Sequence, residues 1–518
     1  MLLALLLLFG LPGCGRVRSD FYYDLGTAPV NLDPQSASDY ASRLVIANLF
    51  EGLLQVGEGG GILPAAAERY MVSDDGLTYR FFLREDGAWE NGDPVTAADF
   101  VWAFQRLFNA DTNAPLASSF FCIENAEAVL GGGLPPSSLG VAAEGERTLV
   151  IRLSAYNARF LYLLTTAPAM PCNRAFFTGT RGKYGLSDKV VMGNGPFCLS
   201  LWDPDQLRLK RSESYSGEIP AQSVRLNILD KMDSPGTVQE RFLEGRTSAA
   251  ALDSLGSLAE EMTWDSSENT VWGISFNTAR EPFSEPAFRK ALLYALDFSA
   301  GEGALPAGAA QAGAIIPQNI LLGGESYRAA AGKHLMPRRD AAAAWDYYQQ
   351  GLAALGRTKL SGLTIILPDT GGHDVFFGYL AQGWQRDLGL YLTVEALPAA
   401  AYQRRLREGS FDLALCALTS SYNSPHGLLE QFEQGNGGNF WGFADETFDG
   451  MLAAAELTAD SKTALSQYLQ AEKLLIDEAV FLPLYYQSEY FVMGEGVSGI
   501  VYDFDSKIVR FQYARRAK

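Results

Sequence analysis

Histidine is scarce in this sequence. The 518 residues include three histidines, His334, His373 and His426, and these are far apart in the chain. Histidine is the usual proton carrier near neutral pH and a frequent metal ligand, so little material is left for a His-based metal site or proton relay. The sequence also lacks a G-x-S-x-G elbow, an H-E-x-x-H pair and a phosphate-binding loop that ends in Gly-Lys-Ser or Gly-Lys-Thr. We therefore expect neither catalytic residues nor a metal or cofactor.

Positive charge is also in deficit. The sequence has 41 Lys and Arg against 60 Asp and Glu, which gives a net charge of −19. A chain of this sign is repelled by a phosphate backbone, so nucleic acid is excluded as a partner. The 47% of hydrophobic and 19% of charged residues are nevertheless typical of a folded protein, and 518 residues suffice for two to four domains.

Long apolar runs are missing except at the start of the chain. Residues 2–9 have the length of a signal-peptide core and fall well short of the roughly 20 residues of a membrane-spanning helix. Cys14 follows, preceded by Leu11, Pro12 and Gly13. This pattern resembles the bacterial lipobox, although Pro12 replaces the usual Ala or Ser and no Lys or Arg precedes the run.

Residues 1–14 are therefore expected to form a lipoprotein signal peptide that ends at the lipidated Cys14. The protein would be exported, and either anchored by its lipid to the outer face of the bacterial cytoplasmic membrane or periplasmic. Ordinary secretion is the alternative.

Four cysteines remain besides Cys14, namely Cys122, Cys172, Cys198 and Cys416. In an oxidising compartment they could form up to two disulfides, and a pair among the first three is plausible. Buried free thiols are the other interpretation, and both stay open. No C-x-x-C spacing occurs, which argues against redox catalysis and against a zinc site.

The first part of the chain has the pattern of an α+β unit. Residues 40–54 have helical spacing, and residues 77–83 and 149–153 alternate as strands. The hydroxyl of Thr96 can cap the helix that follows it. With the Gly, Pro and Ser loop at residues 131–138, the pattern places residues 64–186 as a compact α+β unit of its own.

Strands and helices alternate in two later stretches. We expect strands at residues 224–229, 248–252, 363–367, 391–397 and 411–418, and helices at residues 237–243, 375–388 and 402–407. This spacing implies parallel sheets with covering helices, and thus two α/β lobes. Ligands bind at the carboxyl ends of such strands, so residues 418–423 are the first place to look for a site.

Several short motifs, each weak alone, occur together along the chain. Residues 89–100 read W-E-N-G-D-P-V-T-A-A-D-F and residues 193–197 read G-N-G-P-F. Residues 276–297 contain the block F-N-T, P-F, R, A-L and D, and residues 437–485 contain a final block. In this order the motifs resemble the family 5 extracellular solute-binding proteins, which include the oligopeptide- and dipeptide-binding receptors of ABC importers.

The resemblance implies an α/β, periplasmic-binding-protein-like fold of type II, cluster C. Two α/β lobes would be joined by a hinge, with an extra α+β domain. Lobe I would comprise residues 20–63, 187–270 and 490–518. The extra domain, residues 64–186, would be inserted in lobe I, and lobe II would comprise residues 271–489.

The resemblance also implies which residues face the ligand. They come from both sides of the cleft, with aromatic residues that could pack on the solute: Thr27, Ala28, Pro29, Trp272, Ala417, Thr419, Ser420, Ser421, Tyr422, Asn439, Trp441 and Tyr486. In the oligopeptide receptors, extended backbone pairs with the peptide main chain, a mode that tolerates many side chains.

One position departs from the family pattern. Oligopeptide receptors usually carry an Asp before Tyr-Asn-x-Pro that pairs with the peptide's free amine, whereas this chain has Ser421 before Tyr422. Leu415 also stands where enterobacterial-type receptors have an Arg. A hydroxyl cannot balance a desolvated ammonium, so we expect an N-blocked, cyclic or otherwise modified peptide, or another small solute. Asp374 or Glu433 could supply an acid from a different wall.

The resemblance implies a monomeric receptor that closes around a peptide or peptide-like solute and passes it to an ABC permease and ATPase. Related receptors suggest nickel complexes, haem or oligosaccharides as alternative ligands. Outside this class, the alternatives are a secreted hydrolase and a sensory receptor.

Overall fold

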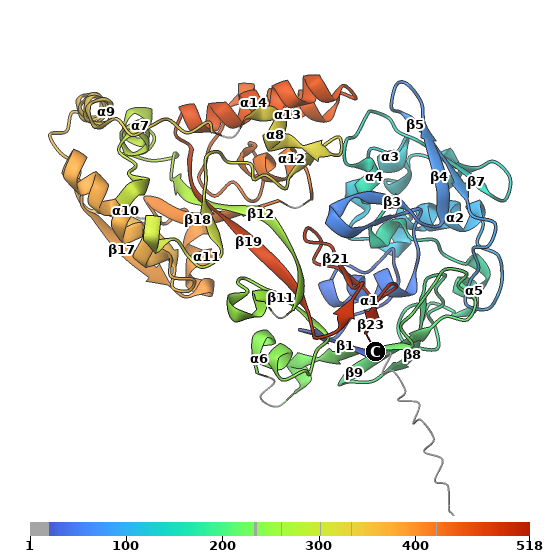
Figure 1. Cartoon of the computed structure of the whole chain (residues 1–518). Coiled ribbons are helices and arrows are strands. Elements are labelled where there is room, and N and C mark those ends of the chain that lie inside the picture. The colour runs from blue at the N-terminus through green and yellow to red at the C-terminus, as the bar shows by residue number, and fades with distance from the viewer. Residues whose placement is uncertain are drawn as a thin grey trace, which may run out of the picture.

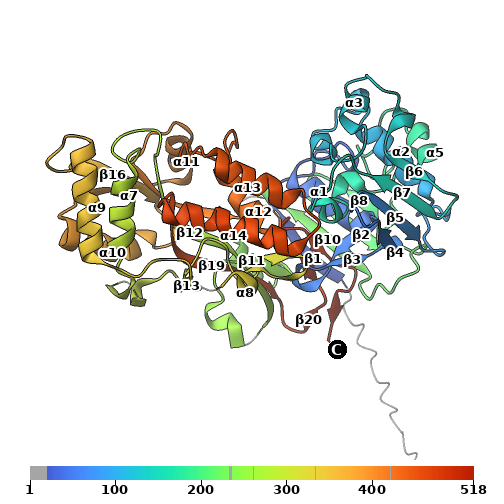
Figure 2. The same cartoon turned by 90° about the horizontal axis from the view of Figure 1, so that it is seen from above.

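A computed structural model describes residues 20–232, 236–260, 262–300, 302–332, 334–420 and 422–517. Figure 1 shows two bodies joined by long strands, and Figure 2 shows the same arrangement from above. We call the body that contains both the early part of the chain and its C-terminal segment lobe I, and the other body lobe II. No helix within the described ranges is long and apolar enough to cross a bilayer.

The α-helices are α1 (Tyr40–Leu49), α2 (Ala97–Leu107), α3 (Ala126–Leu130), α4 (Phe160–Leu163), α5 (Arg174–Gly179), α6 (Val238–Leu243), α7 (Pro286–Tyr294), α8 (Tyr327–Ala331), α9 (Ala341–Ala354), α10 (His373–Leu388), α11 (Ala399–Arg407), α12 (Pro425–Leu429), α13 (Glu446–Glu456) and α14 (Ser461–Asp477). The strands of lobe I are β1 (Asp20–Leu25), β2 (Leu54–Val56), β3 (Ile62–Pro64), β4 (Ala67–Val72), β5 (Thr78–Leu83), β6 (Val141–Ala143), β7 (Thr148–Arg152), β8 (Phe197–Trp202), β9 (Gln206–Arg211), β10 (Ser223–Ile228), β20 (Val497–Ser498), β21 (Val501–Tyr502), β22 (Val509–Arg510) and β23 (Arg515–Arg516). The remaining strands are β11 (Ala249–Leu252), β12 (Thr263–Phe276), β13 (Ala309–Gln311), β14 (Leu321–Leu322), β15 (Glu325–Ser326), β16 (Leu363–Pro368), β17 (Leu392–Leu397), β18 (Leu413–Thr419) and β19 (Phe481–Met493).

The largest sheet has seven strands in the order β11-β19-β12-β18-β16-β17, and β13 also pairs with β19. β16 is parallel to β17 and β18, whereas β12 is antiparallel to both β18 and β19. The sheet is therefore mixed: the expected parallel pairing is confirmed for β16 with β17 and with β18, whereas β12 and β19 are antiparallel to their neighbours. The reason is that the chain enters lobe II along β12 and leaves it along β19, so these two strands run in opposite directions (Figure 1).

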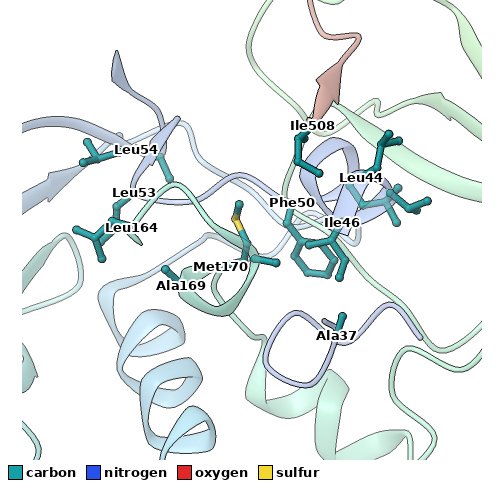
Figure 3. Close-up of a cluster of buried hydrophobic side chains, with 14 of the residues drawn as sticks. Ala37, Leu44, Ile46, Phe50, Leu53, Leu54, Leu164, Ala169, Met170 and Ile508 are labelled. Carbon is teal, nitrogen blue, oxygen red and sulfur yellow. The ribbon is translucent and has the colours of Figure 1, made fainter. Parts of the chain in front are cut away.

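Lobe I contains two four-stranded sheets, β1-β10-β9-β8 and β4-β5-β7-β6. Only β1 and β10 are parallel in the first, which is thus also mixed. One buried apolar cluster extends from the first sheet through the second to the C-terminal segment. Figure 3 shows part of it, where Met170 lies between Phe50 and Leu164, with Ile508 from the C-terminal segment nearby. The domain boundaries at residues 64 and 186 stay a prediction.

Local sequence explains how two of the motifs fold. The helix expected after Thr96 is α2, and a capping box forms because the Thr96 main-chain N–H donates to Asp99 Oδ2 at 2.8 Å. At the G-N-G-P-F turn, a Cβ on Gly193 would lie 1.9 Å from the Leu49 carbonyl oxygen, so only glycine fits. Both motifs stabilise the fold of lobe I.

All four described cysteines carry free thiols, which decides between the two interpretations. Cys172 and Cys416 are buried, and burial raises the pKa of the Cys172 thiol to about 11 and that of Cys416 to about 12. Protonated buried thiols are unreactive, so these two residues serve packing.

A buried ion pair joins α8 and α14 in lobe II. Arg328 Nη2 donates to Glu472 Oε2 at 2.6 Å, and the two side chains are 4% and 0% exposed. The Tyr327 hydroxyl donates to the same oxygen at 3.0 Å. Glu472 also accepts the main-chain N–H of Ile316 at 2.8 Å, so one carboxylate binds three groups, those of Arg328, Tyr327 and Ile316.

We expect Glu472→Gln to lower the free energy of unfolding by about 3–5 kcal/mol, because it leaves the buried guanidinium of Arg328 without its countercharge. Urea unfolding followed by tryptophan fluorescence measures this loss. The control is Arg357→Gln, which breaks the exposed Arg357–Glu281 pair and should cost less than about 1 kcal/mol. Equal losses in the two variants would contradict the assigned role of Glu472.

Candidate functional site

β18 presents a free edge beyond residue 414. β16 pairs with β18 only at Leu413 and Ala414, whereas β12 pairs with it as far as Thr419. The Ser420 N–H donates to the Asn269 carbonyl of β12 at 3.3 Å, so even-numbered residues face β12. By the alternation of antiparallel pairing, the main-chain groups of Ala417 point the other way. The N–H and C=O of Ala417 are therefore available to an added strand.

The side chains beside this edge are neutral. Ala417 and Thr419 are exposed, and the Thr419 hydroxyl lies 2.9 Å from that of Thr270. Trp272 is half-buried and opposite Ala417, and its indole N–H donates to Gln487 Oε1 at 2.6 Å. The surface at the edge combines hydroxyl, indole and methyl groups without a formal charge.

Trp272 is held by its aromatic neighbours. The ring of His373 lies 4.0 Å from that of Trp272, and His373 Nδ1 is 2.6 Å from the Tyr485 hydroxyl. Burial lowers the pKa of His373, so the imidazole is neutral at physiological pH. The stack holds the Trp272 ring in place without adding charge.

The turn after β18 contacts lobe I. The Ser420 hydroxyl donates to the Tyr422 carbonyl, and the Tyr422 ring is buried. The guanidinium of Arg159 lies 3.7 Å from the centre of this ring, in cation–π geometry. The Tyr162 ring lies 6.2 Å away. Tyr422 thus bridges the lobes. Two other predicted residues, Ser421 and Cys14, lie outside the described residues.

A pocket of about 460 Å³ lies at this junction. From lobe I it is lined by Ile62, Tyr70, Tyr156, Arg159, Leu161 and Tyr162, and from lobe II by Leu321, Leu322, Tyr422, Asn423 and Ala464, among others. Among the described residues of the lining, Arg159 is the only Lys or Arg and none is a carboxylate. An apolar or aromatic group of a ligand would therefore be accommodated better than a cation.

His426 lies behind Tyr422 among three carboxylates. Its Nδ1 is 2.7 Å from the Tyr422 hydroxyl and 3.4 Å from Glu430 Oε2. Its Nε2 lies 3.7 Å from Glu433 Oε1 and 3.4 Å from Glu456 Oε2. Burial disfavours the charged imidazole, but the hydrogen bonds to Glu430 and Glu433 and the charge of Glu456 outweigh it and raise the pKa of His426 to about 9.

Other predicted residues have partners within their own lobe. The Asn439 amide bonds to the carbonyls of Phe432, Glu433 and Phe443. Trp441 is 3% exposed in the core of lobe II, and the Tyr486 hydroxyl donates to the Ala314 carbonyl at 2.8 Å. The structure does not bring these three side chains to the edge of β18 or into the junction pocket.

The loop after β1 lies on the other lobe. Thr27 is exposed, Ala28 is half-buried against the core of lobe I, and Pro29 is buried. Of the two acids considered as substitutes at position 421, Asp374 is exposed in the first turn of α10, and Glu433 lies beside His426.

The structure adds an acid that the sequence did not indicate. Asp505 accepts the main-chain N–H of Asn423, and burial together with the charge of Asp503 raises the pKa of Asp505 to about 7. The neighbouring Phe504 carbonyl accepts the Asn269 amide at 3.2 Å. Arg159 and Tyr162 were missed as well, because nothing local in the sequence signals a contact with a turn so distant in the chain. Among the described residues, no group of three or more His, Cys, Asp or Glu is placed to hold a metal ion.

The stability of the protein should depend on the protonation of His426. Because its pKa in the folded state lies above the ordinary 6.5, its contribution is complete below pH 6.5 and is lost as the pH rises through 9. We expect the free energy of unfolding to fall by up to about 3 kcal/mol over this interval. Urea titrations at several pH values measure the slope.

His426→Gln should remove most of this slope. His334→Gln, a change at an exposed histidine, should leave it intact and serves as the control. Identical slopes in the native and His426→Gln chains would contradict the assignment.

Comparison with solved structures supports the fold. The substrate-binding domain of an oligopeptide ABC transporter from Bacillus anthracis str. Ames superposes with a TM-score of 0.68 at 25% identity, over 97% of this chain and 99% of that one. The murein tripeptide-binding protein MppA in its unliganded open form gives a TM-score of 0.74 at 23% identity, over 96% and 97%. The two-lobed type II binding-protein fold is thus confirmed.

Comparison of sequences gives the family. The dipeptide-binding protein DppE of Bacillus subtilis (strain 168) is 28% identical over 494 residues, which are 93% of this chain and 89% of DppE. A family model described as "Bacterial extracellular solute-binding proteins, family 5 Middle" matches residues 61–440. The chain therefore belongs to the bacterial extracellular solute-binding proteins of family 5.

Proposed function

We propose that the protein is the receptor of an ABC importer and captures peptides or peptide-like solutes between its lobes. The observation that carries the proposal is the free main-chain edge of β18 at Ala417. A peptide in extended conformation can add to such an edge through main-chain hydrogen bonds, which are the same for every sequence. The dipeptide- and oligopeptide-binding names of the relatives support the same ligand class.

Side chains of the ligand would occupy the space around this edge. Trp272 offers an aromatic face beside Ala417, and the junction pocket between Tyr162 and Leu322 is large enough for an apolar or aromatic group. Ordering a ligand between two lobes favours the closed arrangement, because the ligand contacts both lobes only in that state. Release to the permease follows when the lobes separate, and no covalent step is needed.

The proposal includes the location and partners of the protein. The family is extracellular, which supports export. We propose further that Cys14 carries a lipid that holds the mature protein at the outer face of the cytoplasmic membrane, and that it acts as a monomer. A permease and an ATPase subunit of an ABC importer are its partners.

Removal of the N–H at the β18 edge should weaken peptide binding. Pro is tolerated where a strand N–H faces solvent, so Ala417→Pro should fold and lose only this donor. We expect its affinity for a tri- to pentapeptide to fall by about tenfold, the effect of one lost hydrogen bond in a dry cleft. Isothermal titration calorimetry measures this change.

Ala417→Ser retains the N–H and is the matched control. If both variants bound peptide as tightly as the native chain, addition to β18 would be excluded.

The serine at position 421 leads to a second prediction, which concerns the N-terminus of the peptide. Without a carboxylate there, acetylation of a peptide's N-terminus should change its affinity by less than about threefold, because no ammonium–carboxylate pair is lost. Matched free and acetylated peptides, titrated under the same conditions, measure the difference.

A strong preference for the free amine would contradict this hypothesis. Asp505→Asn then identifies the acid responsible, because the preference would disappear in that variant if Asp505 supplied the charge.

A further inference from the structure

Basic side chains gather on the solvent face of the sheet β1-β10-β9-β8. Arg225 of β10 lies directly opposite Arg208 of β9, and Lys210 lies opposite Ser223. Together with Arg211 they line a hollow of about 410 Å³. We call Arg208, Lys210, Arg211 and Arg225 the basic face.

The positive charge of the basic face is neutralised only in part from within the protein. None of its four side chains forms an ion pair with a described residue. Asp20 also lines the hollow, but its Oδ1 accepts the Ser223 hydroxyl at 2.6 Å. Glu213, the other acid of the lining, is exposed to solvent.

Like charges directly opposite on neighbouring strands destabilise a sheet. Arg225 has one weak compensation, the ring of Tyr22 with its centre 5.5 Å away. The hollow holds four cations against the two carboxylates Asp20 and Glu213, so in a chain of net charge −19 it keeps a net positive charge and favours an external anion. Guanidinium groups bind phosphate oxygens through paired hydrogen bonds, so a phosphate group is the favoured ligand.

The position of the hollow identifies the source of the phosphate. Asp20, the first residue of β1, lines it, and Cys14 lies six residues upstream. Six residues span at most about 20 Å, so a lipid on Cys14 would keep the basic face within that distance of the membrane surface. Figure 1 shows β1, β8 and β9 together along the lower side of lobe I, whereas α13 and α14 lie along the upper side of the molecule.

We propose that the basic face binds the phosphate groups of anionic phospholipids and holds lobe I against the membrane. The inference rests on the lipid anchor proposed above and is independent of the peptide ligand. A lipid chain and a basic patch act together in membrane binding, because the chain supplies hydrophobic insertion and the patch supplies electrostatic attraction.

The test uses the purified lipid-bearing protein on vesicles of phosphatidylcholine alone or mixed with phosphatidylglycerol. A soluble reagent acetylates exposed lysines, and mass spectrometry gives the rate at each site. We expect Lys210 to react at least about threefold more slowly on the anionic vesicles, because the reagent cannot reach a covered side chain. Lys462 of α14, on the upper side in Figure 1, should react equally on both.

Two double variants separate the effect of the basic face from the effect of the overall net charge. Arg208→Gln combined with Arg225→Gln should abolish the protection of Lys210, and its melting temperature should not fall because a like-charge pair is removed. Arg404→Gln combined with Arg407→Gln, at exposed positions of α11, changes the net charge equally and should retain the protection.

Equal reaction of Lys210 on the two kinds of vesicle would overturn the proposal. Equal protection by soluble glycerol phosphate without vesicles would also overturn it, because the site would then bind a free anion. Failure of the protein to sediment with phosphatidylcholine vesicles would overturn the lipid anchor and this inference together, and would leave the peptide-binding proposal untouched.

Discussion

The antiparallel pairing of β12 with β19 is the constraint on which the rest of the molecule depends. The ladder extends from Thr263 opposite Met493 to Ser275 opposite Phe481, and it carries the chain into lobe II and back again. Two register shifts interrupt it, between Glu268 and Thr270 and between Trp272 and Gly273. Such irregularities bend and twist a strand pair, so the change of direction is concentrated where the lobes meet. The same ladder fixes β12 as the neighbour of β18 and thereby defines which edge of β18 is free.

The cleft and the outer face of the lobe I sheet differ in charge. The chain is strongly acidic overall, yet the side chains around Ala417 are neutral and no described residue that lines the junction pocket is a carboxylate. A neutral cleft suits a ligand recognised through its main chain, because peptides share that chain and differ in the charges of their side chains. The residues that attract anions are instead those of the basic face, on the sheet of lobe I and distant in sequence from β18.

Sequence patterns predicted the local elements well. Thr96 preceded a helix because a capping box is complete within four residues, and the strands of β10 and β16 followed from buried runs between turns. The pairing of the strands was harder to predict from the sequence. β19 contains Pro483 and a polar stretch up to Glu489, so it does not read as one long strand, and its partner β12 lies far away in sequence. The expectation of parallel sheets missed the antiparallel pair β12 and β19 for this reason.

The site could be predicted only in part, because sequence patterns do not show contacts between segments that are distant in the chain. The family resemblance indicated residues 417–422, and of these the structure places Ala417 at a free edge and Tyr422 at the junction of the lobes. Arg159, Tyr162 and Asp505 could not be identified, because their roles exist only once distant segments pack together. Trp441 has an aromatic side chain suited to a ligand, but the core of lobe II surrounds it. Composition indicates which side chains suit a ligand, and only packing decides which of them reach it.

The turn after β18 couples ligand and lobes through its contacts. Tyr422 lies against Arg159 of lobe I, and the Asn423 N–H bonds to Asp505 in the C-terminal segment. The Asn423 side chain in turn accepts the Leu321 N–H at 2.7 Å, within lobe II. A ligand that adds to β18 lies directly beside a segment that touches both lobes. Any displacement of the turn on binding therefore changes the contacts between the lobes, and by thermodynamic linkage the position of the lobes changes the affinity for the ligand to the same extent.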